Sequence, residues 1–305
     1  MESKLYPVYG NSEYGGLYII PGTPVLYVKG YDTIVFSDLH IGFEEAVARG
    51  LDYSTSKTTY VVGMFIPRIQ LKRIIETLNT VFEVVKPKRV VINGDLKHAF
   101  DRLLRQERDE VKHLLNYLLD KGIEEIVLIR GNHDNFLPLV LKDYGIELLQ
   151  KYELVLGDLH IVFTHGHLEV YPREASIVVI GHEHPSLRCM GMHKFPVFLK
   201  IPTTLGPDIL VLPAIGPYHP GTQIALDPHS YLSPIIRKHG VLDRARVIMW
   251  INLGELLEAP KEFCLEESVG ENSIVLISKF TVGNREVAIV DFAGIDKALA
   301  ICGSL

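Results

Sequence analysis

The sequence has few of the features that would indicate a disulfide scaffold or a membrane protein. Its only cysteines are Cys189, Cys264 and Cys302, which are far apart and form no CxxC pair. An odd, scattered set argues against a disulfide framework and a cysteine-based zinc site, so we expect three reduced thiols. No apolar run approaches the roughly 20 residues of a membrane span, and no secretory signal is visible. Both absences predict a cytoplasmic protein.

Basic residues are fewer than acidic ones, and glutamine is scarce. The sequence has 31 Lys and Arg against 37 Asp and Glu, which gives a formal net charge of −6. A protein that coats nucleic acid usually presents a basic face. The acidic total therefore argues against tight non-specific binding, although it leaves room for a local basic groove. The low number of thermolabile amides hints at a thermophilic source.

The first half of the sequence alternates short apolar runs with amphipathic stretches. Residues 33–37, 89–93 and 125–130 read TIVFS, RVVIN and EIVLIR, and such continuous runs are typical of strands buried on both faces. Apolar residues at helical spacing predict helices at 67–85 and 101–120. This order of elements predicts an α/β fold.

Each of these strands ends directly in a polar cluster, and two later strands at 159–164 and 176–180 do the same. The clusters are Asp38-Leu39-His40, Gly94-Asp95-Leu96-Lys97-His98, Gly131-Asn132-His133-Asp134, His165-Gly166-His167 and Gly181-His182-Glu183-His184. In open α/β sheets, ligands bind outside the carboxyl ends of the strands. We therefore expect the clusters to converge in space, although they are far apart in the sequence.

The remainder of the sequence is predicted to be mostly strands. Apolar runs predict further strands at 197–201, 209–212 and 246–251. Turn signals predict two hairpins. One lies near the start of the sequence and pairs 16–20 with 24–28, and the other lies near its end and pairs 273–282 with 285–292. We expect a catalytic domain over residues 1–240 and a small accessory addition of strands and a helix over residues 241–305.

Seven potential metal ligands lie just past the predicted strand ends. They are Asp38, His40, Asp95, Asn132, His165, His182 and His184. Mixed carboxylate and imidazole ligands favour Mn, Fe, Zn or Ni over Ca or Mg. Seven ligands are too many for one tetrahedral zinc, but they suit two cations that share a bridging carboxylate. Such a pair lowers the pKa of the water between them towards ~7 and so supplies a bridging hydroxide.

The ordered motifs DxH, GDxxH, GNHD, HGH and GHxH resemble those of the calcineurin-like metallophosphoesterase superfamily over roughly residues 30–225. His98 in GDxxH, together with the stretch DLHIGFE at 38–44, resembles the archaeal phosphoesterases related to SbcD-type repair nucleases. The resemblance implies a four-layer α-β-β-α sandwich of two mixed sheets. It also implies two divalent cations, most simply Mn, with Asp95 bridging them. The first would take Asp38, His40, Asp95 and His184, and the second Asp95, Asn132, His165 and His182.

The resemblance also assigns catalytic roles. His133 matches the acid/base histidine that contacts the phosphate and protonates the leaving oxygen, a role suited to imidazole. Asp134 would orient the cluster from behind, and His98 would orient His133 or select the substrate. We expect a phosphodiesterase acting on single-stranded DNA or RNA, or on the ends of nucleic acids. A phosphomonoesterase, a small-molecule phosphodiesterase and a non-catalytic scaffold of the same fold stay open as alternatives.

Several polar residues near the motifs receive a structural interpretation or an open one. His219, in the loop PAIGPYHPG, is assigned to loop packing, and Glu44 and Glu45 are assigned to the positive end of their own helix. His167 is a weaker candidate ligand than His165. For Lys97, Arg130, Arg173 and Arg188, binding of phosphate oxygens and solvated surface charge are left as alternatives.

Overall fold

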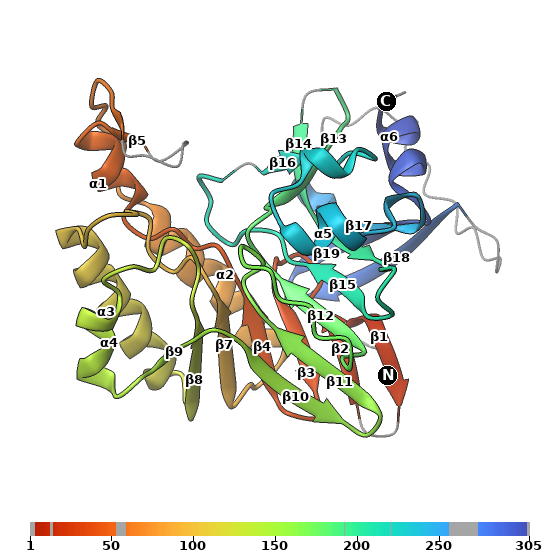
Figure 1. Ribbon diagram of the computed structural model, residues 1–305, viewed down its shortest axis with the longest axis horizontal. Coiled ribbons are helices and arrows are strands. Elements are labelled where there is room, and N and C mark those ends of the chain that lie inside the picture. The colour runs from red at the N-terminus through yellow and green to blue at the C-terminus, as the bar shows by residue number, and fades with distance from the viewer. Residues whose placement is uncertain are drawn as a thin grey trace.

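Two β-sheets lie face to face, with helices on both outer sides (Figure 1). The computed structural model describes residues 4–12, 15–52, 59–191, 193–219, 221–255 and 274–303. In spatial order, the first sheet contains β1 (Tyr6–Ser12), β2 (Gly15–Ile19), β3 (Leu26–Lys29), β4 (Thr33–Phe36), β7 (Arg89–Asn93), β8 (Glu125–Ile129) and β9 (Leu148–Leu149). This is the predicted α/β sandwich of two mixed sheets.

The second sheet has ten strands. Eight follow one another in the order β10 (Tyr152–Leu156), β11 (Leu159–Phe163), β12 (Ile177–Ile180), β15 (Asp208–Val211), β14 (His193–Ile201), β17 (Arg246–Asn252), β19 (Arg285–Phe292) and β18 (Val275–Val282). Off this path, β13 (Pro185–Cys189) pairs with β14, and β16 (Thr222–Gln223) pairs with β13. A separate pair consists of β5 (Leu51–Asp52) and β6 (Thr59–Tyr60).

Helices cover the outer faces of both sheets, with α2, α3 and α4 on one side and α5 and α6 on the other (Figure 1). The helices are α1 (Phe43–Ala48), α2 (Gln70–Val84), α3 (Arg105–Asp120), α4 (Pro138–Leu141), α5 (Pro234–His239) and α6 (Ile295–Gly303). Short 3-10 turns are η1 (Lys142–Tyr144), η2 (Pro228–Ser230), η3 (Leu242–Arg244) and η4 (Leu253–Glu255). Among the described residues, no helix has the length and apolar character that crossing a membrane requires.

Three apolar cores separate the layers, and they explain why the central strands are apolar at every position. In β4, Ile34 and Phe36 pack towards α2 and α3, whereas Val35 packs against the second sheet. In β12, Val178 packs outwards towards α5 and α6, and Val179 packs against the first sheet. A strand covered on both faces loses the alternation of apolar and polar residues. The predicted strands and helices of the first half are confirmed within a few residues at their ends.

The strands that carry the polar clusters are parallel to one another within each sheet. β4, β7 and β8 are parallel neighbours, and so are β11, β12 and β15. The two sheets are joined near this edge by a parallel bridge between Ser37 and Ala214 and by the Asn93 side chain, which donates to the Val179 carbonyl at 3.1 Å. All five polar clusters therefore lie at one rim of the sandwich.

The C-terminal segment completes the second sheet. β17 pairs with β14 and with β19, and α6 is tied to β13 by a disulfide between Cys189 and Cys302. The expectation of reduced thiols is therefore wrong for these two cysteines, and Cys264 lies outside the described residues. The pair was missed because the two positions are 113 residues apart and only the fold brings them together.

Candidate metal centre

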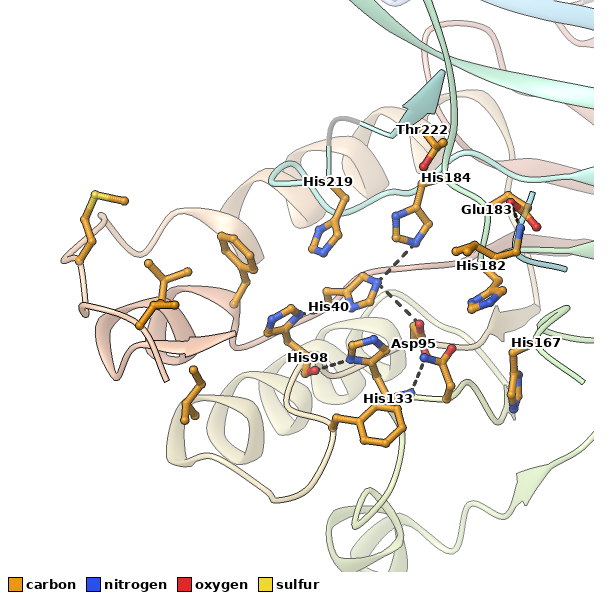
Figure 2. A pocket seen from close by; sticks show the side chains of 18 of the residues that line it. His40, Asp95, His98, His133, His167, His182, Glu183, His184, His219 and Thr222 are labelled. Atoms are coloured by element: carbon orange, nitrogen blue, oxygen red, sulfur yellow. Dashed lines mark hydrogen bonds and ion pairs between the residues drawn. The ribbon is translucent and has the colours of Figure 1, made fainter. Parts of the chain in front are cut away.

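Hydrogen bonds bind the loops after β4, β7, β11 and β12 to one another. The loop after β4 joins the loop after β7, because the His40 amide donates to the Asp95 carbonyl at 2.9 Å. The loop after β12 joins those after β11 and β4: Gly181 donates to the His165 carbonyl at 3.0 Å, and the His182 amide donates to Asp38 Oδ2 at 3.1 Å. The side chains of these loops line one cleft of about 910 Å³ (Figure 2).

Three of the predicted ligands form a first cluster. The ligand atoms of Asp38, His40 and His184 all lie within 4.8 Å of one another. The Nε2 atom of His184 is 3.0 Å from Asp38 Oδ1 and 3.4 Å from His40 Nε2. Two imidazole nitrogens and one carboxylate oxygen so close together are a suitable donor set for a transition-metal cation.

A second cluster lies beside the first. The ligand atoms of Asp95, His165 and His182 also lie within 4.8 Å of one another. Asp95 Oδ2 is 3.2 Å from His165 Nε2 and 3.7 Å from His40 Nε2, so this carboxylate stands between the two clusters. The structure thus places Asp95 where a shared ligand would be needed.

One predicted ligand atom is buried without a hydrogen-bond partner among the described residues. It is Asn132 Oδ1, and Asn132 lines the cleft. Burial of an acceptor without a donor costs about 1–3 kcal/mol, and a bound cation would remove that cost. His165 Nδ1 hydrogen-bonds to the Asn93 carbonyl at 2.9 Å, which turns Nε2 towards Asp95 Oδ2. The residues present therefore fit a metal pair.

The charges of the cluster side chains also suit cations. Burial tends to raise the pKa of Asp38, but pairing with His184 and His165 outweighs it and lowers that pKa. Burial and repulsion from His165 lower the pKa of His182 to about 3. Burial tends to lower the pKa of His165, but Asp95 and Asp38 outweigh it and raise that pKa to about 10. A cation bound at the second cluster would take the place of the His165 proton.

Five of the seven predicted ligands have left-handed backbone conformations. Their φ angles are 57° for Asp38, 48° for His40, 51° for Asp95, 67° for His182 and 44° for His184. A residue with a side chain in this region costs about 1 kcal/mol or more. Strain concentrated at one rim of the sheet is typical of a functional site.

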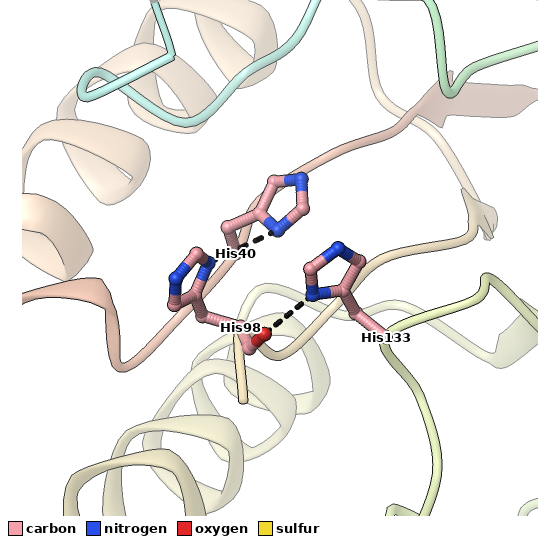
Figure 3. Close-up of side chains that lie close together, drawn as sticks. All are labelled: His40, His98 and His133. Atoms are coloured by element: carbon pink, nitrogen blue, oxygen red, sulfur yellow. Dashed lines mark hydrogen bonds between the residues drawn. The ribbon is translucent and has the colours of Figure 1, made fainter. Parts of the chain in front are cut away.

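His133 and His98 lie beside His40 of the first cluster (Figure 3). The His133 amide donates to Asp95 Oδ1 at 2.9 Å, and His133 Nδ1 hydrogen-bonds to the His98 carbonyl oxygen. His98 Nδ1 faces His40 Nδ1 at 3.4 Å, and its ring stacks against that of His133 with 5.6 Å between the centroids. The backbone of His98 thus orients His133, while its side chain contacts a predicted ligand.

Asp134 lies behind the clusters and does not line the cleft. Its Oδ2 accepts hydrogen bonds from the amides of Asp95 at 2.9 Å and Gly131 at 2.8 Å, and its Oδ1 accepts one from the Leu96 amide at 2.9 Å. Burial and repulsion from Asp95 raise its pKa. Asp134 therefore ties the loop after β7 to the loop after β8, which makes it a positioning residue.

Glu44 and Glu45 lie in the first turn of α1, at the positive end of their own helix as expected, but their hydrogen bonds go to neighbouring helices. Glu44 Oε1 accepts hydrogen bonds from the amides of Ile69 at 2.7 Å and Gln70 at 2.8 Å, where α2 begins. Glu45 likewise accepts a hydrogen bond from the Gln106 amide, in the first turn of α3, at 2.6 Å. Both acids lie at the positive ends of neighbouring helices because tertiary contacts place those ends beside α1.

Lys97 is neither a phosphate ligand nor a solvated surface charge. Its side chain is fully buried, and its ammonium group donates to the carbonyls of Ala99 and Arg102. Burial lowers its pKa. The amine holds the loop after β7 in shape and is turned away from the cleft.

His219 belongs to the site, and its assignment to loop packing is wrong. Its ring stacks on His40 with 4.0 Å between centroids and an angle of 13° between the rings. The loop that carries it is bound to the loop after β4, because the Gly216 amide donates to the Asp38 carbonyl at 3.1 Å. The available signal was positional: this loop follows β15, which is parallel to β12, so it emerges at the same rim.

The comparisons with known proteins agree with this geometry. Residues 31–211, more than half of the chain, match the family model described as calcineurin-like phosphoesterase. The chain belongs to this family. It is a metal-dependent hydrolase, and its family uses a pair of divalent cations. No curated protein matches the chain.

The chain is also similar to several solved structures. One is the nuclease MPE of Pseudomonas putida, at 18% identity, with 80% of this chain and 96% of that chain covered and a TM-score of 0.48. A second is a dimetal phosphatase from Danio rerio, at 13% identity, with 71% and 94% covered and a TM-score of 0.39. A third is a Vps29 single mutant from Entamoeba histolytica, at 14% identity, with 85% and 98% covered and a TM-score of 0.30.

Proposed function

We propose that the chain is a dinuclear-metal phosphodiesterase that hydrolyses nucleic acid. The observation that carries this proposal is the pair of three-residue clusters with Asp95 between them. Manganese is the proposed metal, because mixed nitrogen and oxygen donors suit first-row transition ions. His98, at the last position of GDxxH, supports the narrower resemblance to SbcD-type archaeal nucleases.

We assign each cluster to one cation. The first cation would be held by Asp38, His40, Asp95 and His184, and the second by Asp95, Asn132, His165 and His182. His167 lies near the second cluster, with its ring 5.3 Å from that of His165, and stays a weaker candidate for metal binding than His165. When bound, a divalent pair supplies an acidified water and neutralises charge on the phosphate.

The remaining chemistry belongs to the side chains around the clusters. With Nδ1 hydrogen-bonded to the His98 carbonyl, His133 presents Nε2 on the side of the ring that faces His40 (Figure 3). From there it can donate a proton to the leaving oxygen of a bound ester. Asp134 holds the loops after β7 and β8 in fixed positions relative to each other, so that His133 and Asp95 keep their relative placement.

A second recess supports a polyanionic substrate. It has a volume of about 350 Å³ and shares Phe100, Asn132 and His167 with the main cleft. Its wall includes Arg130, whose guanidinium group donates to Asn135 Oδ1 at 2.8 Å. A guanidinium group in a recess that adjoins the cleft suits the neighbouring phosphate of a nucleic-acid chain.

Three substrates test the proposal when each is assayed with Mn²⁺. They are bis(p-nitrophenyl) phosphate, p-nitrophenyl phosphate and a single-stranded oligonucleotide. We expect the two diesters to be hydrolysed much faster than the monoester. A preference for the monoester would favour a phosphomonoesterase, and activity on the small diester alone would favour a small-molecule phosphodiesterase. Hydrolysis of none of the three by protein with two bound cations would contradict the proposal.

A further inference from the structure

One wall of the metal cleft is apolar and exposed. Four exposed apolar side chains lie within the five residues 61–65, among them Val62, of which 93% is accessible, and Phe65, of which 86% is accessible. Val61, Val62 and Met64 line the same cleft as Asp95 and His133. An exposed apolar patch of this kind marks an interaction site.

The backbone holds this segment in place against α1. The Val61 amide donates to the Gly50 carbonyl at 2.8 Å, and the Met64 amide donates to the Val47 carbonyl at 3.1 Å. A Cβ added at Gly63 would lie 2.3 Å from the Ala48 carbonyl oxygen, so this approach requires glycine. The apolar side chains are therefore presented by a fixed support, which stands apart from both sheets (Figure 1).

Phe43 connects this wall to the metal clusters. It opens α1, its ring centroid lies 5.0 Å from that of His98 and 5.5 Å from that of His219, and it stacks on Tyr218 at 5.2 Å. We call Phe43, Val47, Val61, Val62 and Met64 the apolar shelf, since all five line the cleft. Through His98 and His219, which both contact His40, the shelf adjoins the first cluster.

The chemistry of the shelf selects its occupant. Residues 61–67 (VVGMFIP) carry no charged side chain, so they offer nothing to a phosphate. A flat apolar group attached to the scissile phosphate would meet Phe43, as bases of single strands stack on aromatic side chains, and would bury the apolar surface of the two valines. In a duplex, the faces of a base are covered by its stacked neighbours.

We propose that the apolar shelf binds the unpaired nucleobase next to the scissile phosphate, which makes single strands and frayed ends the substrates. This inference rests on the proposed phosphodiesterase function. It assigns the base to the side of the first cluster and the neighbouring phosphate to Arg130, on the side of the second. Recognition of this kind tolerates any base, because every base has a flat face.

The test compares two single-stranded oligonucleotides with the same backbone, one of thymidylates and one of abasic residues. For the intact Mn²⁺-loaded chain, we expect the abasic strand to have a KM about 10-fold higher, as for the loss of one stacked base. Replacing Val62 and Met64 together by serine should raise KM for the thymidylate strand about 10-fold, with kcat within 2-fold. The same variant should leave KM for the abasic strand unchanged.

Val155→Ser is the matched control, because Val155 is also exposed and lies outside the cleft lining. It should change none of these constants. Equal KM values for the two strands, or a shelf variant that behaves like wild type, would overturn the inference while leaving the phosphodiesterase function intact. The inference would also be overturned if the only effect of the shelf substitutions were a change in the oligomeric state of the protein, since the shelf would then contact a second copy of the chain. Absence of hydrolysis of any ester would instead refute the proposed function itself.

Discussion

Replacing His133 by alanine tests the proton-transfer step of the proposed function. The substitution removes the ring but keeps the backbone amide that donates to Asp95 Oδ1 at 2.9 Å. The contacts that hold the clusters together therefore persist, and the variant should still bind two cations per chain. What is lost is the Nε2 donor beside His40.

The size of the effect should depend on the leaving group. General acid catalysis contributes about 10²–10⁴ in rate, or roughly 3–5 kcal/mol of barrier. A nucleotide alkoxide needs the proton, so kcat for an oligonucleotide should fall by that factor. A p-nitrophenolate leaves as a stable anion, so kcat for bis(p-nitrophenyl) phosphate should fall by less than about 10-fold.

The proton-donating role is tested by measuring kcat for both esters, together with the metal content of the same samples. His113→Ala is the control, because His113 is exposed on α3. Equal losses for the two leaving groups with both cations retained would refute a proton-donating role. A loss of metal would instead show that the ring is needed to hold the clusters.

Three further predictions concern other parts of the chain. Burial raises the pKa of Glu110 to about 7 from 4.5, so the folded state binds its proton more tightly and stability falls as pH rises between these values. Glu110→Gln should therefore add about 1–2 kcal/mol to the free energy of unfolding at pH 8, after allowance for partial exposure, and almost nothing at pH 4. Urea unfolding at the two pH values measures this, and equal increases in the free energy of unfolding at pH 8 and pH 4 would contradict it. Replacing Cys189 and Cys302 together by serine should lower the free energy of unfolding by about 2–4 kcal/mol without changing kcat, whereas an unchanged melting temperature would argue that the bond contributes nothing. Arg130→Gln should raise KM for an oligonucleotide several-fold and weaken its salt dependence, while KM for a small diester stays the same; Arg173→Gln, also exposed, should do neither.

The fold and the position of the site could be predicted because both depend on local patterns. Buried parallel strands such as β4 and β7 are continuous apolar runs, and each ends where its polar cluster begins. Parallel neighbours deliver these ends to one rim. The convergence of Asp38, Asp95 and His182 therefore followed from the order of elements, without any knowledge of their contacts.

Other features depend on contacts that no local pattern records. Glu44 lies in the first turn of its own helix as expected, but its carboxylate also accepts from the amide of Gln70, 26 residues later, where α2 begins. Cys189 and Cys302 meet only because α6 packs beside β13. His219 carries no ligand motif, and only the direction of β15 brings it onto His40. The left-handed φ angles of the cluster residues are likewise imposed by tertiary structure.

Anomalous scattering from a crystal grown with Mn²⁺ tests most directly whether two cations share Asp95 at this rim of the sandwich. We expect two peaks of similar height, one beside Asp38, His40 and His184 and the other beside Asn132, His165 and His182, with Asp95 between them. A single peak, or peaks that do not touch Asp95, would contradict it.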